Sequence, residues 1–563
     1  MDIRRTILWM IFSFSLLLLW NNWQVHNGKP SLFGSSPTAT QTASSTQTPA
    51  ATPADASVPT TAPGTPAQVA ASDAVPGGNN QPANASEKVN IKTDVFDLTF
   101  DTLGAQLVEA ELLKYAAPGD SKLPMVLLDN SASSVYLAQT GVIGAPAGAS
   151  YPTHLTPFKL VSSENNLTGD SLKVVFESET DGVKVVKTYT LHKGRYDIQV
   201  QHDIYNLGTT AVTPSLYLQL TRDGNDPSDT SSFYSTFTGP ALYSAQDKFQ
   251  KIKFSDIDKG KSNYIKEADN GWIGVVQHYF ATAWVPTEGV VRHNEALRVS
   301  DNLYAIRSIE SVGAIQPGDH KVVESNLWVG PQDQKAMSEL APGLELVVDY
   351  GWLTIIAKPL FKIMTWLHAI LGNWGWTIVA LTFLIKLVFY PLSAASYRSM
   401  AKMKLVTPRM QALREKFGDD KAKLNAAMME MYRTEKINPL GGCLPMVVQI
   451  PVFISLYWVL LGSVEMRGAP WILWIHDLAA RDPWFILPAF MMATMFLQIK
   501  LNPTPPDPTQ AKIMMIMPLV FGGMMFFFPA GLVLYWCVNN SVSIAQQRYI
   551  MYKLDKENAA ASR

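Results

Sequence analysis

The stretch Trp376-Thr-Ile-Val-Ala-Leu-Thr-Phe-Leu-Ile-Lys-Leu-Val-Phe-Tyr-Pro-Leu392 is apolar enough to enter a lipid bilayer, yet it contains a cation at Lys386. A cation inside a transmembrane helix costs roughly 2.5–3.5 kcal/mol on insertion scales, so it usually faces a water-filled cavity or a polar partner. Lys386 also lies near the end of the stretch, where a long side chain can reach the interface by snorkelling. Its position alone leaves both interpretations open.

The C-terminal part of the chain contains five apolar segments, each near the roughly 20 residues that a helix needs to cross a bilayer. These segments are Leu371–Leu392, Leu440–Leu461, Trp484–Leu501, Ile513–Phe528 and Leu532–Ile550. A sixth, Thr6–Trp20, follows a basic N-terminus and lacks a small-residue cleavage site after it, so we expect a retained signal anchor rather than a cleaved signal peptide. The sequence predicts an α-helical polytopic membrane protein with six transmembrane helices.

Basic residues in short loops predict the orientation of these spans. Residues 393–437, between the first two of the five C-terminal spans, carry ten basic and five acidic residues, which places this loop in the cytoplasm. The basic tail 551–563 is separated from the loop by four spans and falls on the same side, as does the basic N-terminus. Both termini are therefore expected in the cytoplasm, and the residues between the anchor and residue 350 outside.

Residues 91–345 show period-two alternation of apolar side chains, as in Ile198/Val200 and Leu216/Leu218/Leu220, with turn residues between the alternating runs. This pattern predicts a large β-sandwich. Residues 28–90 before it are rich in Pro, Ala, Ser and Thr and almost without charge, which predicts a disordered linker. The histidines lack metal-ligand spacing, and no phosphate-binding glycine motif is present, so we expect no catalytic residue, no metal and no cofactor. A net charge of −1 argues against a nucleic-acid substrate.

Two helical regions flank the first of the five C-terminal spans. Residues 350–371 mix lysines with apolar residues, which predicts an amphipathic helix on the outer membrane surface; a surface helix of the soluble domain is the alternative. Residues 393–437 place apolar residues at spacings of three and four in two runs, which predicts an antiparallel helical hairpin, bent at Pro408. Its methionines either pack in the seam between the two helices or contact varied apolar segments of a client protein.

The last apolar segment carries a polar stripe. Its members share one helical face and are Trp536, Asn539, Asn540, Ser543 and Gln547. Thr382 lies one turn before Lys386, and Gln449 adds a polar group in another span. Amides that face lipid go unsatisfied, so these groups either line a shared hydrophilic recess or form hydrogen bonds between helices.

Four longer motifs are more specific. They are Lys436-Ile-Asn-Pro-Leu-Gly-Gly-Cys-Leu-Pro445, Trp474-Ile-His-Asp-Leu478, Pro529-Ala-Gly-Leu-Val-Leu-Tyr-Trp536 and Gly271-Trp-Ile-Gly-Val-Val-Gln-His-Tyr-Phe-Ala-Thr-Ala-Trp284. In this order they closely resemble the YidC/Oxa/Alb family of bacterial membrane protein insertases, over nearly the whole chain. The resemblance implies a six-span protein of the bacterial inner membrane, with a periplasmic all-β supersandwich and a five-helix core around a hydrophilic groove.

The resemblance also implies roles for individual residues. The groove of the family holds a cation, usually Arg, at the position of Lys386; Lys keeps the charge but lacks the multidentate geometry of Arg. Client-contacting positions match Thr382, Tyr535 and Trp536, the last of which is more often Tyr. With the polar groups above, the predicted substrate-binding set is Lys386, Thr382, Gln449, Tyr535, Trp536, Asn539, Asn540 and Ser543.

The expected function is insertion and folding of inner-membrane proteins without covalent chemistry, alone or with the Sec translocon. Expected partners are nascent membrane proteins, the Sec translocon, the phospholipid bilayer, and the ribosome through the hairpin and tail. The expected organisation is a signal anchor (1–27), a linker (28–90), a periplasmic β-domain (91–345), an interfacial helix (350–371), a core (371–550) that includes the hairpin (393–437), and a cytoplasmic tail (551–563).

Two other functions fit parts of the sequence. A groove within the core could serve a secondary transporter, which paired broken helices and an outward-facing path would indicate; neither is visible. Alternatively, the β-domain could be a saccharide-binding or sugar-modifying module that the helices merely anchor. Deleting residues 100–320 distinguishes this module from an insertase whose groove lies in the helices.

Overall fold

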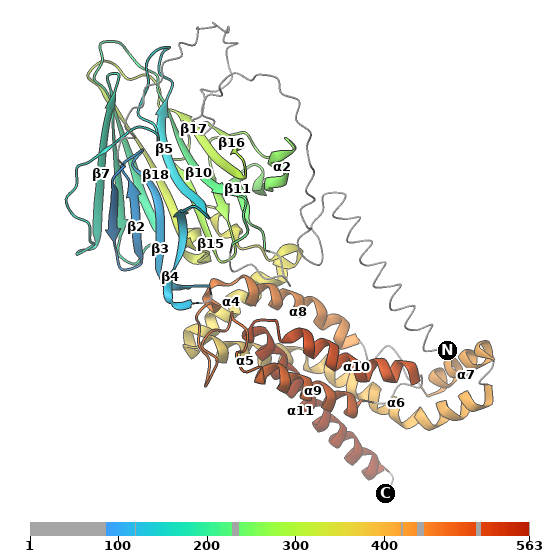
Figure 1. Cartoon of the computed structure of the whole chain (residues 1–563). Coiled ribbons are helices and arrows are strands. Elements are labelled where there is room, and N and C mark those ends of the chain that lie inside the picture. Colours follow the sequence, from blue (N-terminus) through green and yellow to red (C-terminus); the bar gives the residue numbers. More distant parts are fainter. Residues whose placement is uncertain are drawn as a thin grey trace, which may run out of the picture. The chain divides into compact units, whose positions relative to one another are not determined.

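A computed structural model describes residues 86–118, 120–227, 236–417, 420–435, 444–502 and 508–561. The predicted anchor 1–27 and nearly all of the predicted linker 28–90 lie outside these residues. The chain divides into two compact units, with the boundary between Val348 and Asp349. The first is a β-domain and the second is helical (Figure 1).

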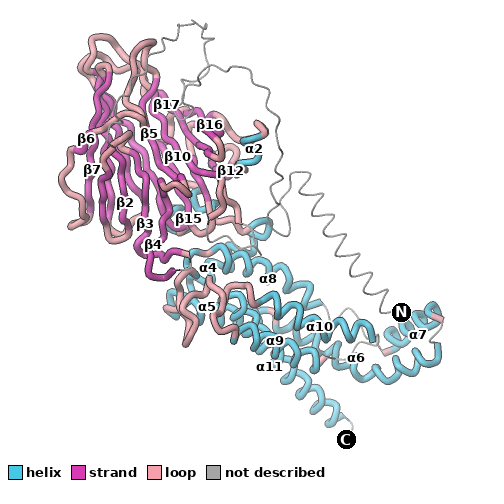
Figure 2. Tube along the Cα trace, in the orientation of Figure 1, coloured by secondary structure: helices cyan, strands magenta, loops and turns pink. Residues whose placement is uncertain are grey.

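The β-domain is built from two antiparallel sheets, which Figure 2 shows as two layers of strands. In the part of the chain that the structure describes, each sheet has nine strands. The first has the order β1 (Lys88–Lys92), β2 (Phe96–Asp101), β3 (Gln106–Ala117), β4 (Asp120–Asn130), β5 (Val135–Ile143), β10 (Ser215–Asp223), β17 (Leu303–Ser311), β16 (Arg292–Ser300) and β13 (Glu267–Ala268). The second has the order β12 (Lys248–Lys251), β11 (Gly239–Ser244), β14 (Trp272–Val276), β15 (Phe280–Pro286), β18 (His320–Pro331), β9 (Asp197–Asn206), β8 (Val183–His192), β7 (Ser171–Thr180) and β6 (Lys159–Leu160).

The alternating apolar residues face the space between the sheets, because successive side chains of a strand point to opposite faces. On β8, Val183, Val185, Tyr189 and Leu191 are buried in this way. The first strand begins at Lys88, before the predicted start at residue 91, because Val89 pairs with Phe100 and is buried. The predicted linker therefore extended a few residues too far.

Lys187 occupies one of the inward positions of β8 and is fully buried. Its ammonium donates hydrogen bonds to the backbone oxygens of Gly104, in the β2–β3 turn, at 2.7 Å, and of Thr140, on β5, at 2.9 Å. Burial lowers the pKa of Lys187 to about 7. The adjacent His202, whose Nε2 lies 2.9 Å from the Thr140 hydroxyl, has its pKa lowered to about 3 by burial and by the charge of Lys187. These polar groups tie the two sheets together.

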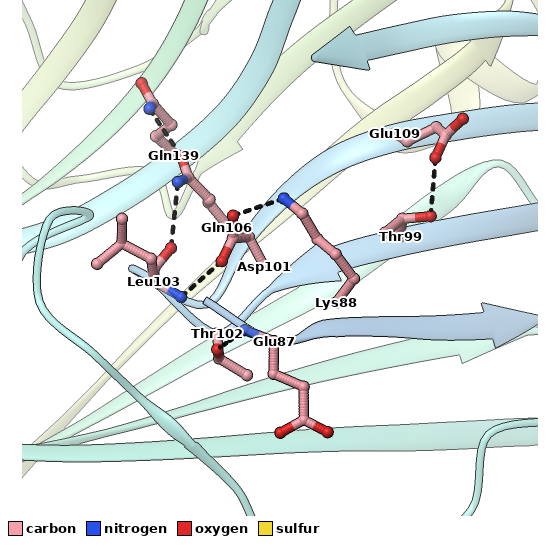
Figure 3. A network of polar contacts seen from close by, with 9 residues as sticks. All are labelled: Glu87, Lys88, Thr99, Asp101, Thr102, Leu103, Gln106, Glu109 and Gln139. Carbon is pink, nitrogen blue, oxygen red and sulfur yellow. Dashed lines mark hydrogen bonds and ion pairs between the residues drawn. The ribbon is translucent and has the colours of Figure 1, made fainter. Parts of the chain in front are cut away.

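A second polar network joins β1, the β2–β3 turn and β5 (Figure 3). Lys88 donates to Asp101 at 2.6 Å, and the same carboxylate accepts from the Leu103 backbone at 2.8 Å. Gln106 then donates to the Leu103 oxygen and accepts from Gln139 at 2.8 Å. The turn is therefore held by side chains from both neighbouring strands, and this fixes the register at which β3 begins.

The helical unit contains α4 (Thr354–Leu371), α5 (Trp374–Val388), α6 (Tyr390–Phe417), α7 (Lys421–Thr434), α8 (Leu444–Gly462), α9 (Ile486–Leu501), α10 (Pro508–Met525) and α11 (Ala530–Ala561). Helix α4, predicted as an interfacial helix, packs against α5 and α8 through Ala357, Leu360, Phe361 and Met364. The region predicted as a helical hairpin contains α6 and α7, with buried Val406 and Met410. Helix α6 is continuous through Pro408.

Length and composition single out α4 as the one helix, within the described residues, that could cross a membrane by itself. Helix α5 and the first part of α6 pass the same test only together, and they are bent by 65° at the break between them. The other apolar helical stretches, Val448–Gly462, Ile486–Leu501 and Lys512–Met525, are shorter.

The bend after α5 changes one predicted boundary. The sequence predicts a span through Leu392, whereas α5 ends at Val388 and Phe389 leaves the helical conformation. Pro391 explains the break, because proline lacks a backbone donor and its ring clashes with the carbonyl four residues earlier, that of Leu387 in the last turn of α5. At its other end α5 begins where Asn373 accepts a hydrogen bond from the Trp376 backbone at 3.1 Å.

Candidate polar site among the helices

Lys386 lies in the last turn of α5 and is 6% exposed. Its ammonium donates to the hydroxyl of Ser543 on α11 at 2.8 Å. In the described part of the chain, no carboxylate lies within ion-pair distance of this ammonium. Among the described residues, a neutral hydroxyl is therefore the hydrogen-bond partner of a buried cation, which is an unusual arrangement because buried charges are generally paired. Snorkelling does not describe this position, since the ammonium points to a neighbouring helix.

The polar stripe on α11 is also engaged by neighbouring helices. Asn539 accepts from Gln449 of α8 at 2.8 Å, and Asn540 donates to Thr494 of α9 at 3.3 Å. Ser543 donates to the Asn539 backbone oxygen at 2.7 Å and accepts from Lys386. We call Lys386, Gln449, Thr494, Asn539, Asn540 and Ser543 the Lys386 cluster. Its contacts in this structure are the hydrogen bonds between helices that the sequence left as one of two alternatives.

The stripe continues toward the C-terminus. Gln547 donates to the side-chain oxygen of Asn502 at 3.1 Å and is 4% exposed. Thr382, one turn before Lys386, is 1% exposed, and its hydroxyl donates to the Ile378 backbone oxygen at 2.7 Å. Thr382 therefore shares the buried face of α5 with Lys386, but its hydroxyl is satisfied within its own helix.

The two aromatic residues of the predicted site have different surroundings. Tyr535 is 1% exposed, and its ring stacks with Phe453 of α8 at 6.1 Å between centroids. Trp536 is only half-buried and lies between Phe453 and Phe521 of α10, at 4.8 and 5.2 Å. Its indole N–H is buried without a hydrogen-bond partner in the described residues. Trp536 therefore offers a donor and an aromatic surface between α8 and α10.

Sequence reasoning missed several partners of the site. Thr494, Asn502 and Tyr397, whose hydroxyl donates to the Ser543 backbone oxygen at 3.3 Å, are isolated polar residues without a pattern. It also missed Asp482, which is 2% exposed and accepts from the Trp474 indole and from the backbone of Leu487 in α9. The signal for Asp482 was available, since aspartate is favoured just before a helix.

The loop with Asp482 closes one end of the helices. The backbone of Gly531, at the start of α11, donates to the Leu478 oxygen at 2.9 Å, and that of Ala530 donates to the Ala480 oxygen at 2.7 Å. A small apolar cavity lies here, lined by residues of α8, the loop and α11 that include Tyr457, Leu478 and Leu532. The Lys386 cluster does not line it, so this cavity is separate from the candidate site.

Comparisons with known proteins cover both units. Residues 88–363 match the family model of the YidC periplasmic domain, and residues 366–557 match that of the 60Kd inner membrane protein. A membrane protein insertase YidC of Bordetella parapertussis is 70% identical over 563 residues, covering 100% of both chains. The protein of that name from Paraburkholderia phytofirmans is 52% identical over 572 residues, again covering 100% of both. A solved structure of an active YidC insertase is 17% identical, has a TM-score of 0.39, and matches 81% of this chain and 91% of its own.

These matches define an inner-membrane protein with a periplasmic all-β domain and a helical C-terminal part. Its relatives are insertases, which is not a class of enzyme. The chain belongs to the YidC family of membrane protein insertases.

Proposed function

We propose that this chain inserts nascent membrane proteins by letting polar parts of the client replace the interhelical hydrogen bonds of the Lys386 cluster. The observation that carries the proposal is a buried ammonium held by a serine hydroxyl, with no carboxylate in ion-pair distance among the described residues. A client carboxylate is a better partner for that ammonium than a hydroxyl, because attraction between opposite charges adds to the hydrogen bond in a site shielded from water.

The energetics of insertion explain why a polar path is useful. Each Leu, Ile, Phe or Val at the centre of a client helix contributes roughly 0.3–0.6 kcal/mol toward insertion, so the overall process is downhill. The obstacle is the passage of the client's polar flank through hydrocarbon. A hydrophilic groove that opens around Lys386 shortens this passage, and the apolar client helix leaves into lipid beside α8 and α10.

The remaining parts have proposed roles around this path. Six spans, counting the anchor, place the hairpin α6–α7 and both termini in the cytoplasm. The hairpin receives the client first, through apolar side chains such as Leu405 and Met429, which are 71% and 67% exposed. Basic residues of the hairpin and of the tail contact the ribosome, and the Sec translocon acts with the chain on some clients.

Photocrosslinking of a stalled nascent membrane protein tests the proposal. A photoreactive amino acid is placed at Asn539 or Tyr535, which are 8% and 1% exposed, and the control position is Val459 of α8, which is fully buried but outside the cluster. We expect client crosslinks from the first two positions, because the client must part the helices to reach them, and none from Val459. Absence of crosslinks at Asn539 and Tyr535, with the chain active and the client bound elsewhere, would refute the proposed path.

A further inference from the structure

The β3–β4 hairpin of the β-domain has an unusual tip. Its ladder shifts register once between Ala110 and Glu111 and twice more beyond the pair Leu112–Met125, both members of which are buried. We call residues 113–118 and 120–124 the hairpin tip. Leu113 and Leu123 in the tip are 36% and 58% exposed, and Val126 beside it is 39% exposed. The tip therefore presents apolar side chains that the domain itself does not cover.

Lysines accompany the leucines on both sides of the tip. Lys114 follows Leu113 and Lys122 precedes Leu123; both lysines are exposed. Lys114 is 4.0 Å from Asp94, which leaves its ammonium largely in solvent. Leucines flanked by lysines suit the boundary between lipid headgroups and acyl chains, because the leucines bury while the ammonium groups remain at the phosphates.

The base of the tip has a fixed position within the β-domain. The ring of Tyr115 packs edge-on against Phe280 at 5.5 Å, and Phe280 pairs with Pro331 at the end of the last strand, β18. The Leu113 backbone donates to the Val95 oxygen at 2.9 Å, which anchors the start of the tip. The tip therefore projects from the end of the domain at which β18 finishes.

The chain leaves the β-domain at this same end, the lower one in Figure 1. After β18 it forms α3 (Gln334–Leu340) and the short helix η1 (Leu344–Val347), and the helical unit begins at Asp349. Only Asp349–Leu353 separate the β-domain from α4, which is apolar and long enough to enter a membrane. Five residues reach at most about 18 Å, so this connection limits how far the last residue of the β-domain can lie from the first residue of α4.

We propose that the hairpin tip docks on the outer surface of the phospholipid bilayer, with Leu113 and Leu123 among the upper acyl chains and Lys114 and Lys122 at anionic headgroups. The occupant of this exposed apolar surface is thus lipid, not a second protein. This docking is independent of the path around Lys386, and it gives the β-domain a preferred face toward the membrane.

Depth-dependent fluorescence quenching tests the docking in the full chain. The full chain carries the substitution Leu123→Cys, with Cys443 and Cys537 replaced by serine, and an environment-sensitive fluorophore is attached to the cysteine at position 123. The labelled protein is reconstituted in phosphatidylethanolamine–phosphatidylglycerol vesicles. The matched control is Val322→Cys, which is 46% exposed and lies on β18 at the other end from Pro331, about 30 Å away. Nitroxide on the upper acyl chain should quench the label at position 123 and not at 322, and aqueous iodide should show the reverse.

Charge reversal gives a second measurement. Each lysine near an anionic surface strengthens binding about fivefold, so Lys114→Glu with Lys122→Glu should weaken nitroxide quenching at position 123 in these vesicles. Quenching at 123 by iodide but not by nitroxide overturns the proposal. A label at 123 that neither agent reaches also overturns it, because a protein then covers the tip.

Discussion

Replacing Lys386 with methionine separates the role of its charge from that of its bulk. Methionine is apolar and of similar length, and it removes the cation that donates to Ser543. The Ser543 hydroxyl still donates to the Asn539 backbone oxygen at 2.7 Å, so the variant leaves no buried donor unpaired at this position. Removing an uncompensated buried charge costs the fold little, and we expect the variant to accumulate in the membrane at the normal level.

The expected effect of Lys386→Met on the rate of insertion follows from the burial of Lys386. A client carboxylate that takes the place of Ser543 forms a charge-assisted hydrogen bond in a site that is 6% exposed. Such bonds contribute about 1.5–3 kcal/mol net. At 1.36 kcal/mol for each tenfold change in rate, Lys386→Met should slow the translocation of an acidic flank by about 10- to 150-fold.

The assay is protease protection of a single-span client in proteoliposomes, with acidic or amide residues in the translocated flank. The acidic client should be slowed by Lys386→Met and little affected by Lys386→Arg, while the amide client should be inserted at a nearly normal rate by all three chains. Lys500→Met, at an exposed lysine on α9, is the matched control for loss of a positive charge. Equal slowing of both clients would refute the electrostatic role, because it would show a loss of structure instead.

Three further predictions follow from the two units. A chain without residues 100–320 should support growth of a depleted strain, and failure with stable protein in the membrane would contradict the proposed location of the insertion path. Cysteines replacing Asn539 or Ser543 should react with a charged maleimide from the cytoplasmic side while Val542→Cys should not; uniform protection would favour dry packing. The β-domain should lose stability as pH falls from about 6.5 to about 3, because His202 binds a proton in the unfolded chain but stays neutral when buried in the folded domain. The free energy of unfolding should fall by about 5 kcal/mol over this range. Denaturant unfolding at several pH values measures this loss, which should be smaller in His202→Gln.

The parts of the helical unit that could be predicted from sequence are polar residues that interrupt apolar runs. Lys386 and the α11 stripe stand out because each breaks a hydrophobic pattern and, for the stripe, because helical spacing gathers its members on one face. Their partners Thr494 and Tyr397 could not be predicted, since a lone hydroxyl in a helix carries no information about which neighbour it meets. The bend before Pro391 was predictable from the proline but was obscured by the length of the apolar run.

The β-domain shows a different limit. The alternation of apolar and polar side chains predicted strands that face a common core. The same pattern assigns charged residues to the solvent face, and the buried Lys187 contradicts that assignment. Lys187 lies in phase with Val185 and Tyr189, so its phase indicated an inward position while its charge indicated an outward one. The contact that resolves the conflict comes from carbonyl oxygens of Gly104 and Thr140, more than 45 residues away in sequence. Backbone carbonyl groups occur at every residue, so the sequence does not indicate which of them accept hydrogen bonds from Lys187. Only the structure identifies these partners.

The chemistry of the Lys386 cluster suits the proposed site, which would open to admit a client and then close. A carboxylate partner for Lys386 would hold the helices with an interaction that costs about 3–5 kcal/mol to break when buried. The hydrogen bonds found instead, from Gln449 to Asn539 and from Asn540 to Thr494, join neutral groups and contribute only about 1 kcal/mol each. Water or a client's polar groups can replace them at little net cost. In the proposed mechanism, a cation among neutral partners would therefore combine attraction for an acidic client with a low barrier to admitting it, whereas an internal ion pair would provide neither.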